Sequence, residues 1–441
     1  MKTKNKTIAL LEIAVVLCSV FLVALPATGI AADQNVQQEM QKVITPEVLT
    51  ASEDDYILEI YSNANEDDTI DMRDFTYTAR IILELEDPTD LADANFDGEI
   101  TVGDMAQIGL IILGREHELT FVDSMDRIVT VNKPVERVII DFWIDAAVTL
   151  QSLKAEDVVV GVTDVIIDEP ILFPELSELP CIGVVYWPDY EKILELEPDV
   201  VLIGTDYMTF DEIQDTIQSL NPDIVVLRFD YAVPSSYADE VTKLGYIFDR
   251  EEEAEELIDF IEGHLSTIEE KVSDIPDDER VKVYVEWWGD YSTTGSEEYI
   301  EMAGGNNIFS EIVGYPSAVD REVLIERDPE VIIRLWGGGY QTDDVTEMRN
   351  KRDEIMDRPG FATVAAVDSE CVYMCYSNII VSTTYFVGVS YYAKWFYPGL
   401  FENLDANAIH QEYLDRFLRI DFDLSEHGVF VYHPEQHPDG R

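Results

Sequence analysis

Two stretches of this chain carry the same pattern, EKILELEPDVVLI at residues 191–203 and EVLIERDPEVIIR at residues 322–334. Each contains a short amphipathic segment, a proline, and then a run of mostly β-branched apolar residues. A residue before proline disfavours helical geometry, and a continuous apolar run is typical of a buried parallel strand. The repeated unit therefore predicts two similar α/β lobes, whose ligands should bind at the carboxyl ends of the strands.

A single long helix is predicted between the two lobes. Residues 251–272 have apolar side chains at helical spacing and begin with a glutamate cluster that suits a helix amino terminus. The expected fold class is α/β, with two Rossmann-like lobes joined by one long helix and preceded by a small all-α module. The expected bounds of the solute-binding body (119–434) are 119–248 for lobe 1, 279–400 for lobe 2 and 401–434 for a C-terminal segment.

Charge and leader sequence limit the possible functions. The net charge of −61 excludes a nucleic-acid binder, because phosphate contacts need Lys and Arg. The acids are spread along the chain, which favours a solvated surface suited to high salt over a cation-collecting surface. Residues 1–31 have a basic start and an apolar run, typical of a secretory signal peptide, with a retained anchor as the alternative. Residues 32–52 are expected to be a polar linker, and the protein is expected to work outside the cytoplasm.

The small module at 53–116 contains its own repeat. NANEDDTIDMRDFTYTARIIL (63–83) aligns with DANFDGEITVGDMAQIGLIIL (93–113). Each copy opens with oxygen-bearing residues at loop positions 1, 3, 5, 7, 9 and 12, the arrangement that wraps Ca²⁺. The candidate ligands are Asn63, Asn65, Asp67, Thr69, Asp71 and Asp74 in the first loop, and Asp93, Asn95, Asp97, Glu99, Thr101 and Asp104 in the second. Thr69 and Glu99 would contribute backbone carbonyls. The alternative is a pair of Asx-rich turns.

This module resembles a type I dockerin over roughly residues 60–115. The resemblance implies two bound Ca²⁺ ions and a cohesin-like protein partner. Two residues of the first loop depart from the pattern: Asn63 at position 1, and Asp68 at position 6, where the second loop has Gly98.

The body resembles class III solute-binding proteins of ABC importers. The resemblance rests on the long helix, the two repeated stretches and RPGFATVAAVDSECVYMC at 358–375, and the tail at 408–434 is similar to archaeal members for iron complexes. It implies capture of an iron–siderophore complex between the lobes and delivery to a membrane permease dimer, with cobalamin or haem as alternatives. It also implies that Glu191 and Glu322 dock on the permease.

Aromatic side chains gather in the predicted strand-end loops, where they could stack on a bulky metal complex. The candidate ligand-binding residues are Trp143, Trp187, Tyr207, Trp288, Arg334, Trp336 and Tyr376. Arg334 would bind an anionic group of the ligand, and the alternative for it is a structural ion pair. No histidine occurs between residues 118 and 263, which argues against a bare zinc ion.

Catalysis is not expected, because the sequence contains no GxSxG, HExxH, P-loop or GxGxxG motif. A third class remains open, a cell-surface scaffold in which the calcium module is the functional part.

Overall fold

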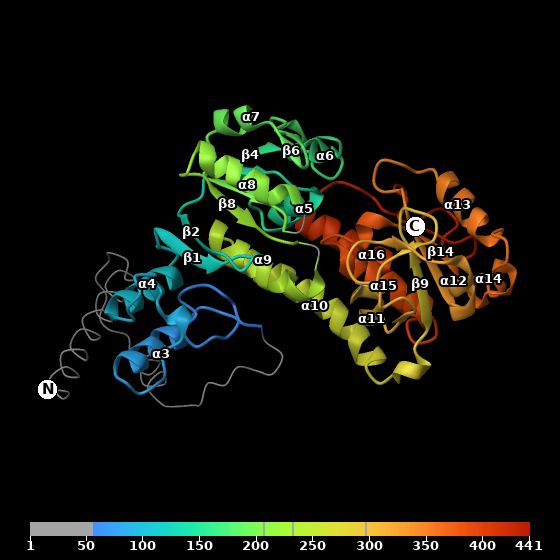
Figure 1. The fold of residues 1–441 in the computed structure, drawn as a ribbon, viewed down its shortest axis with the longest axis horizontal. Coiled ribbons are helices and arrows are strands. Elements are labelled where there is room, and N and C mark those ends of the chain that lie inside the picture. Colours follow the sequence, from blue (N-terminus) through green and yellow to red (C-terminus); the bar gives the residue numbers. More distant parts are fainter. Residues whose placement is uncertain (1–55, 206–207, 232, 296–297) are drawn as a thin grey trace. The chain divides into compact units, whose positions relative to one another are not determined.

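The computed structural model describes residues 56–205, 208–231, 233–295 and 298–441. The expected signal peptide, the linker and Tyr207 lie outside these ranges. The described residues form two compact units, one made of 56–135 with 242–249, and the other of the described parts of 136–241 and 250–441 (Figure 1). The first boundary falls later than the expected start of lobe 1 at residue 119, because the hairpin that precedes residue 135 belongs to the first unit.

The first unit contains two loop–helix copies and a hairpin. Its elements are α3 (Met72–Ile82), η1 (Asp90–Ala92), α4 (Val102–Ile112), β1 (Glu118–Val122) and β2 (Ile128–Asn132), and the two strands are antiparallel. Each helix begins with a reciprocal capping box, formed by Asp71 with Asp74 in α3 and by Thr101 with Asp104 in α4. Such boxes satisfy the amide groups that a helix start leaves unpaired.

The second unit contains two lobes, each built on its own sheet. The first sheet has the order β4-β3-β7-β8, and all its neighbouring strands are parallel. The second has the order β11-β9-β13-β14-β15, in which only the edge strand β15 is antiparallel. The sheet strands are β3 (Val138–Ile140), β4 (Val159–Val162), β7 (Val200–Ile203), β8 (Val225–Arg228), β9 (Lys282–Glu286), β11 (Asn306–Asn307), β13 (Val331–Trp336), β14 (Val372–Tyr376) and β15 (Val431–Tyr432).

Helices and short elements complete the two lobes, except that the end of one helix, residues 242–248, belongs to the first unit. The helices are α5 (Ile144–Ser152), α6 (Asp164–Ile167), α7 (Tyr190–Glu195), α8 (Met208–Leu220), α9 (Pro234–Phe248), α10 (Glu251–Val272), α11 (Glu298–Met302), α12 (Arg321–Arg327), α13 (Thr346–Met356), α14 (Ala365–Asp368), α15 (Tyr385–Phe396) and α16 (Ala406–Tyr413). The short strands are β5 (Gly183–Val184), β6 (Trp187–Pro188), β10 (Ser292–Thr293) and β12 (Ser317–Ala318). The short helical turns are η2 (Glu156–Val158), η3 (Leu176–Glu178), η4 (Asp277–Glu279), η5 (Phe361–Thr363), η6 (Ser377–Ile379) and η7 (Leu414–Leu418).

The repeated sequence units form the elements that their pattern predicts. Residues 191–203 fold as most of α7 followed by β7, and residues 322–334 fold as most of α12 followed by the start of β13. Both strands are buried, as a continuous apolar run requires. The predicted long helix at 251–272 is confirmed as α10, which joins the lobes along the chain and packs Phe260 against Phe386 of α15.

Among the described residues, no helix is long and apolar enough to span a membrane.

Candidate functional site

Exposed tryptophans lie near the carboxyl-terminal edge of the first sheet. Trp143 follows β3 and precedes α5, and 42% of its surface is exposed. Its indole N–H donates to the hydroxyl of Tyr186 over 3.0 Å. Trp187 packs edge-on against Tyr186 and is 71% exposed. Such a cluster offers flat apolar surface together with a polar rim, and it brings the predicted residues Trp143 and Trp187 together around Tyr186.

The second sheet presents a matching group of tryptophans. Trp288 follows β9, is 60% exposed and meets Trp287 edge-on, with ring centroids 5.1 Å apart. Trp336 ends β13 and is only partly exposed. Cations from Arg334 and Lys351 lie 4.9 and 5.1 Å from the Trp336 ring centre, so at least one face of this ring is already occupied.

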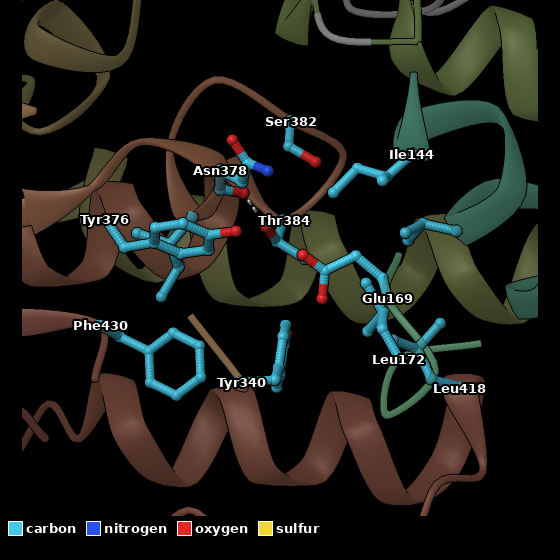
Figure 2. Close-up of a pocket in the computed structure, with 12 residues that line it drawn as sticks. Ile144, Glu169, Leu172, Tyr340, Tyr376, Asn378, Ser382, Thr384, Leu418 and Phe430 are labelled. Carbon is cyan, nitrogen blue, oxygen red and sulfur yellow. Dashed lines mark hydrogen bonds between the residues drawn. The ribbon is translucent and has the colours of Figure 1, made fainter. Parts of the chain in front are cut away.

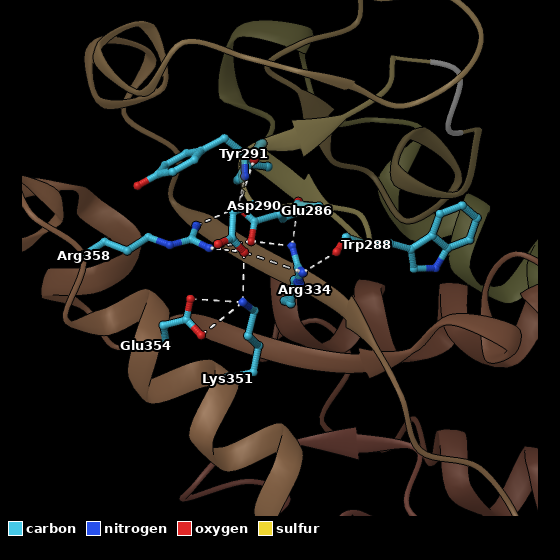
Figure 3. A network of polar contacts seen from close by, with 10 residues as sticks. Glu286, Trp288, Asp290, Tyr291, Arg334, Lys351, Glu354 and Arg358 are labelled. Atoms are coloured by element: carbon cyan, nitrogen blue, oxygen red, sulfur yellow. Dashed lines mark hydrogen bonds and ion pairs between the residues drawn. The ribbon is translucent and has the colours of Figure 1, made fainter.

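The guanidinium of Arg334 is committed to a buried network (Figure 3). Its Nη1 donates to Glu286 Oε1 over 2.6 Å and to the carbonyl of Gly289 over 2.9 Å, and its Nη2 donates to the carbonyl of Trp288 over 2.9 Å. Only 1% of the arginine side chain is exposed. In this structure Arg334 therefore forms the structural ion pair that the sequence left as the alternative, and its role toward an anionic ligand stays a prediction.

Glu286 is the centre of this network. Its carboxylate also receives two hydrogen bonds from Arg358, at 2.6 and 2.8 Å, one from the amide of Tyr291 at 2.9 Å and one from the hydroxyl of Tyr284 at 3.2 Å. Asp290, which is half-exposed, pairs with Arg358 and with Lys351. Glu286 is not among the residues predicted from the sequence, although an acid at the end of the apolar strand β9 suggests a buried partner for an arginine on a neighbouring strand.

A small cavity of about 20 Å³ lies between side chains of the two lobes (Figure 2). It has room for roughly one water molecule. The predicted residue Tyr376 forms part of its wall, together with Glu169 and Tyr340. Burial raises the pKa of Glu169 and of Tyr376. This cavity is too small for a metal chelate, so Tyr376 is placed between the lobes but not in an open binding pocket.

A larger hollow of about 280 Å³ lies between the first turn of α9, the middle of α10, α11 and the start of α15. Its wall is mostly apolar and includes Ile261 and Met302, while Glu262 and Glu298 add carboxylates. Ser235 donates a hydrogen bond of 3.2 Å to Glu298. None of the predicted ligand-binding residues lines this hollow.

Two buried aspartates stand at the start of α5. Asp141 follows β3, is fully buried, and has no hydrogen-bond partner for either carboxyl oxygen. Burial raises its pKa to about 7. Asp145 is held by the hydroxyl of Ser382 and the amide of Thr383 from the other lobe, and burial raises its pKa to about 6. Neither residue is predicted from the sequence, because an isolated Asp in an apolar run belongs to no motif with a recognisable spacing.

The two predicted docking glutamates occupy equivalent positions. Glu191 lies in the first turn of α7 behind the capping Asp189, and Glu322 lies in the first turn of α12 behind the capping Asp320. Both glutamates are exposed. Each helix runs back against the parallel strand that follows it, so its amino terminus lies on the edge where the strands of its own sheet end.

The second loop of the small unit presents an uncompensated set of acids. Asp93 accepts from the amides of Asp97 and Gly98, at 3.0 and 2.8 Å, and Asp104 accepts from those of Asn95 and Thr101, at 3.1 and 2.6 Å. Burial is the largest cause that raises the pKa of Asp104, and the nearby Asp93 and Asp97 raise it further. These oxygens and the turn at Gly98, with its φ of +92°, suit a calcium loop.

The first loop has a different balance of charge. Arg73 lies 2.9 Å from Asp67 and 2.9 Å from Asp71, with its Nη1 and Nε respectively. Asn63 is buried, and its amide nitrogen donates to the carbonyls of Leu58 and Asp67. Within the described part of the chain, no group of three or more His, Cys, Asp or Glu side chains is arranged to hold a metal ion. Calcium would therefore also need the Asn, Thr and carbonyl oxygens of a loop.

Comparisons with known proteins identify the second unit. The family model of periplasmic binding proteins matches residues 146–378, more than half of the chain. The molybdate-binding protein MolA of Haemophilus influenzae is 22% identical over 277 residues, which cover 57% of this chain and 76% of MolA.

Solved structures show the same fold. The TroA-like periplasmic binding protein FepB of Veillonella parvula aligns with a TM-score of 0.60 at 23% identity, covering 71% of this chain and 99% of that one. Molybdate-bound MolA aligns with a TM-score of 0.57 at 20% identity over 69% and 99%. Helicobacter pylori CeuE in a nickel–histidine complex aligns with a TM-score of 0.55 at 16% identity over 69% and 96%. The chain therefore belongs to the periplasmic binding protein family.

Proposed function

We propose that this protein captures a bulky metal chelate, an iron complex of siderophore type, and delivers it to a membrane permease. The observation that supports this ligand class is the exposure of Trp143, Trp187 and Trp288 near the strand ends of both sheets. Large aromatic surfaces bind flat or bulky organic ligands by stacking and apolar burial. Haem and cobalamin would use the same surfaces and are the alternatives within this class.

A small oxyanion such as molybdate fits the described strand ends less well. Oxyanions in proteins are commonly held by charge-assisted N–H donors. Arg334 in β13 is paired with Glu286, and Arg228 in β8 pairs with Asp211 and donates to the carbonyl of Gly204 over 3.1 Å. The strand arginines on which an oxyanion would rely are therefore committed to internal partners.

The ligand class can be tested by titrating the purified protein while tryptophan fluorescence is recorded. The ligands are a ferric hydroxamate, a ferric catecholate, haem, cyanocobalamin and molybdate. Binding of a chelate should quench the exposed tryptophans, and Trp288→Ala should weaken it about 10-fold, the effect of roughly 1.4 kcal/mol of stacking. Leu220→Ala, an equally exposed apolar residue of α8, should change nothing. Binding of molybdate alone would refute the proposal.

Delivery is proposed to use Glu191 and Glu322. A pair of equivalent, exposed carboxylates on two similar lobes can meet two equivalent arginine sites on a dimeric permease. Both glutamates stand in first turns whose amides are already capped by Asp189 and Asp320. Their carboxylates are therefore not needed to start the helices.

The small unit is proposed to bind Ca²⁺ through its loops and to dock a cohesin-like protein. The support is the pair of loop–helix copies with matching capping boxes, and in particular the acids of the second loop. A bound Ca²⁺ ion would compensate the charge of Asp93, Asp97 and Asp104 and fix the turn at Gly98. The first loop differs in ways that change the expected number of ions.

A further inference from the structure

The two loops of the small unit differ most at loop position 11. In the first loop this residue is Arg73, and in the second it is Gly103. The Arg73 guanidinium reaches back over the loop and contacts Asp67 at position 5 and Asp71 at position 9, each at 2.9 Å. One cationic group thus bridges two of the side chains that would coordinate a metal ion.

Loop position 1 differs in the same direction. Asn63 is fully buried, and its amide nitrogen donates to the carbonyls of Leu58 and Asp67 over 2.8 and 2.5 Å. Its side-chain oxygen accepts from the amide of Asp67 over 3.2 Å. Position 1 of the first loop is therefore an uncharged side chain that is already hydrogen-bonded to backbone groups of the loop. Position 1 of the second loop is the carboxylate of Asp93.

The two loops also differ in whether their acids are paired with a basic side chain. In the second loop, Asp93, Asp97 and Asp104 form no ion pair with any basic side chain that the structure describes. In the first loop, Arg73 compensates Asp67, whose side chain is only 5% exposed. Inserting a divalent cation there would require the guanidinium to leave and would place two cationic groups together.

We propose that Arg73 takes the place of a calcium ion in the first loop, so that the unit binds a single Ca²⁺ ion, in the second loop. The inference has two parts. The first, that Arg73 holds the first loop in shape without metal, concerns this chain's own residues, and the second, that one Ca²⁺ ion binds in the second loop, rests on the proposed calcium function.

The stoichiometry test uses the full chain, stripped of metal with a chelator and titrated with Ca²⁺ by calorimetry. A high background of NaCl suppresses weak binding to the acidic surface by screening. The wild type should bind one ion tightly. Asn63→Asp with Arg73→Ala, which gives the first loop a carboxylate and removes its guanidinium, should bind two. Gly103→Arg should lose the single site or weaken it at least 10-fold, while Gly103→Ala should keep it.

A Cβ at residue 103 would lie 3.1 Å from the side-chain nitrogen of Asn95 and from the hydroxyl oxygen of Thr101, both candidate ligands. Gly103→Ala therefore measures the effect of the added Cβ alone, and the effect of the guanidinium is the difference between Gly103→Arg and Gly103→Ala. Two tight ions in the wild type would refute the proposal. So would a single ion that Gly103→Arg leaves unaffected, because that ion would lie in the first loop or elsewhere.

A second measurement separates the two parts of the inference. In excess chelator, Arg73→Ala should lower the melting temperature of the small unit by several degrees, since it leaves Asp67 buried without its cation. Alanine is a good helix former, so a loss of helix propensity cannot explain the fall. If the wild type binds no calcium, the calcium function fails, and the melting shift still decides the role of Arg73. An unchanged melting temperature would refute that role.

Discussion

Replacing Glu286 with glutamine should destabilise the second unit strongly. Glu286 is fully buried between Arg334 and Arg358, whose side chains are 1% and 5% exposed. Removing its charge leaves two guanidinium groups buried without a carboxylate between them. Breaking a buried pair in this way costs about 3–5 kcal/mol. At roughly 2–4 °C per kcal/mol for a domain of this size, the melting temperature should fall on the order of 10 °C.

The assay is urea denaturation followed by circular dichroism, supported by calorimetry. Asp290→Asn is the matched control, because Asp290 contacts Arg358 and Lys351 but is 49% exposed. Exposed pairs are worth about 0–1 kcal/mol, so this variant should stay close to the wild type. Because Asp290 has its pKa lowered, mainly by its hydrogen bond from Lys351, its small contribution should be lost as the pH falls through that lowered pKa.

Arg334→Ala separates the structural role from a ligand-binding role. It should lower the free energy of unfolding and leave the affinity of the folded protein for its chelate nearly unchanged. A loss below about 1 kcal/mol for Glu286→Gln would refute the reasoning, since a buried charge pair cannot be broken so cheaply. A stable Arg334→Ala variant with weakened ligand affinity would instead support a role for Arg334 in binding an anionic group of the ligand.

Two further outcomes are expected. Asp141→Asn should raise the free energy of unfolding at pH 8 by roughly 2–4 kcal/mol. In the wild type this free energy should decline as the pH rises from about 4 through 7, and the variant should lack that decline. The reason is that the pKa of Asp141 in the folded state lies at about 7, so the folded state holds its proton longer than the unfolded state does. Urea denaturation at pH 5 and pH 8 measures this, and the same change in the free energy of unfolding between the two pH values in the wild type and the variant would contradict the prediction. Glu191→Lys with Glu322→Lys should abolish uptake by cells while ligand affinity stays intact, and reversal of the exposed Glu269 and Glu270 of α10 is the control. Normal transport by the first pair would contradict the docking assignment.

The fold followed from the sequence wherever local pattern and burial agree. The helix–proline–strand units at 191–203 and 322–334 and the helix at 251–272 appear as α7–β7, α12–β13 and α10. Periodicity determined these elements because each buries a continuous apolar face. Trp143, Trp187 and Trp288 are exposed, but their predicted role in ligand binding stays a prediction.

The buried charges could not be predicted in the same way. Arg334 contacts Glu286 only because β9 and β13 are neighbours in the sheet, and the sequence of neither strand predicts that order. Arg73 acts within its own loop, but its effect depends on the side-chain rotamer and on the buried amide of Asn63. Asp141 gives no signal at all, because a single acid next to an apolar strand has many equally plausible environments.

The pairing of the two strand arginines with internal acids has a consequence for the ligand. The chain carries 90 acidic residues against 29 Lys and Arg, and Arg228 and Arg334 are held by internal acids. A ferric tris-hydroxamate is neutral, whereas a ferric tris-catecholate carries three negative charges and must approach a protein of net charge −61. In the fluorescence titration the neutral complex should therefore bind more tightly. Added salt should strengthen the binding of the catecholate complex and leave the binding of the hydroxamate complex nearly unchanged. The reason is that screening removes electrostatic repulsion, which acts only on the charged complex. A catecholate that binds more tightly at low salt would show that a cation outside the described strand ends serves the site.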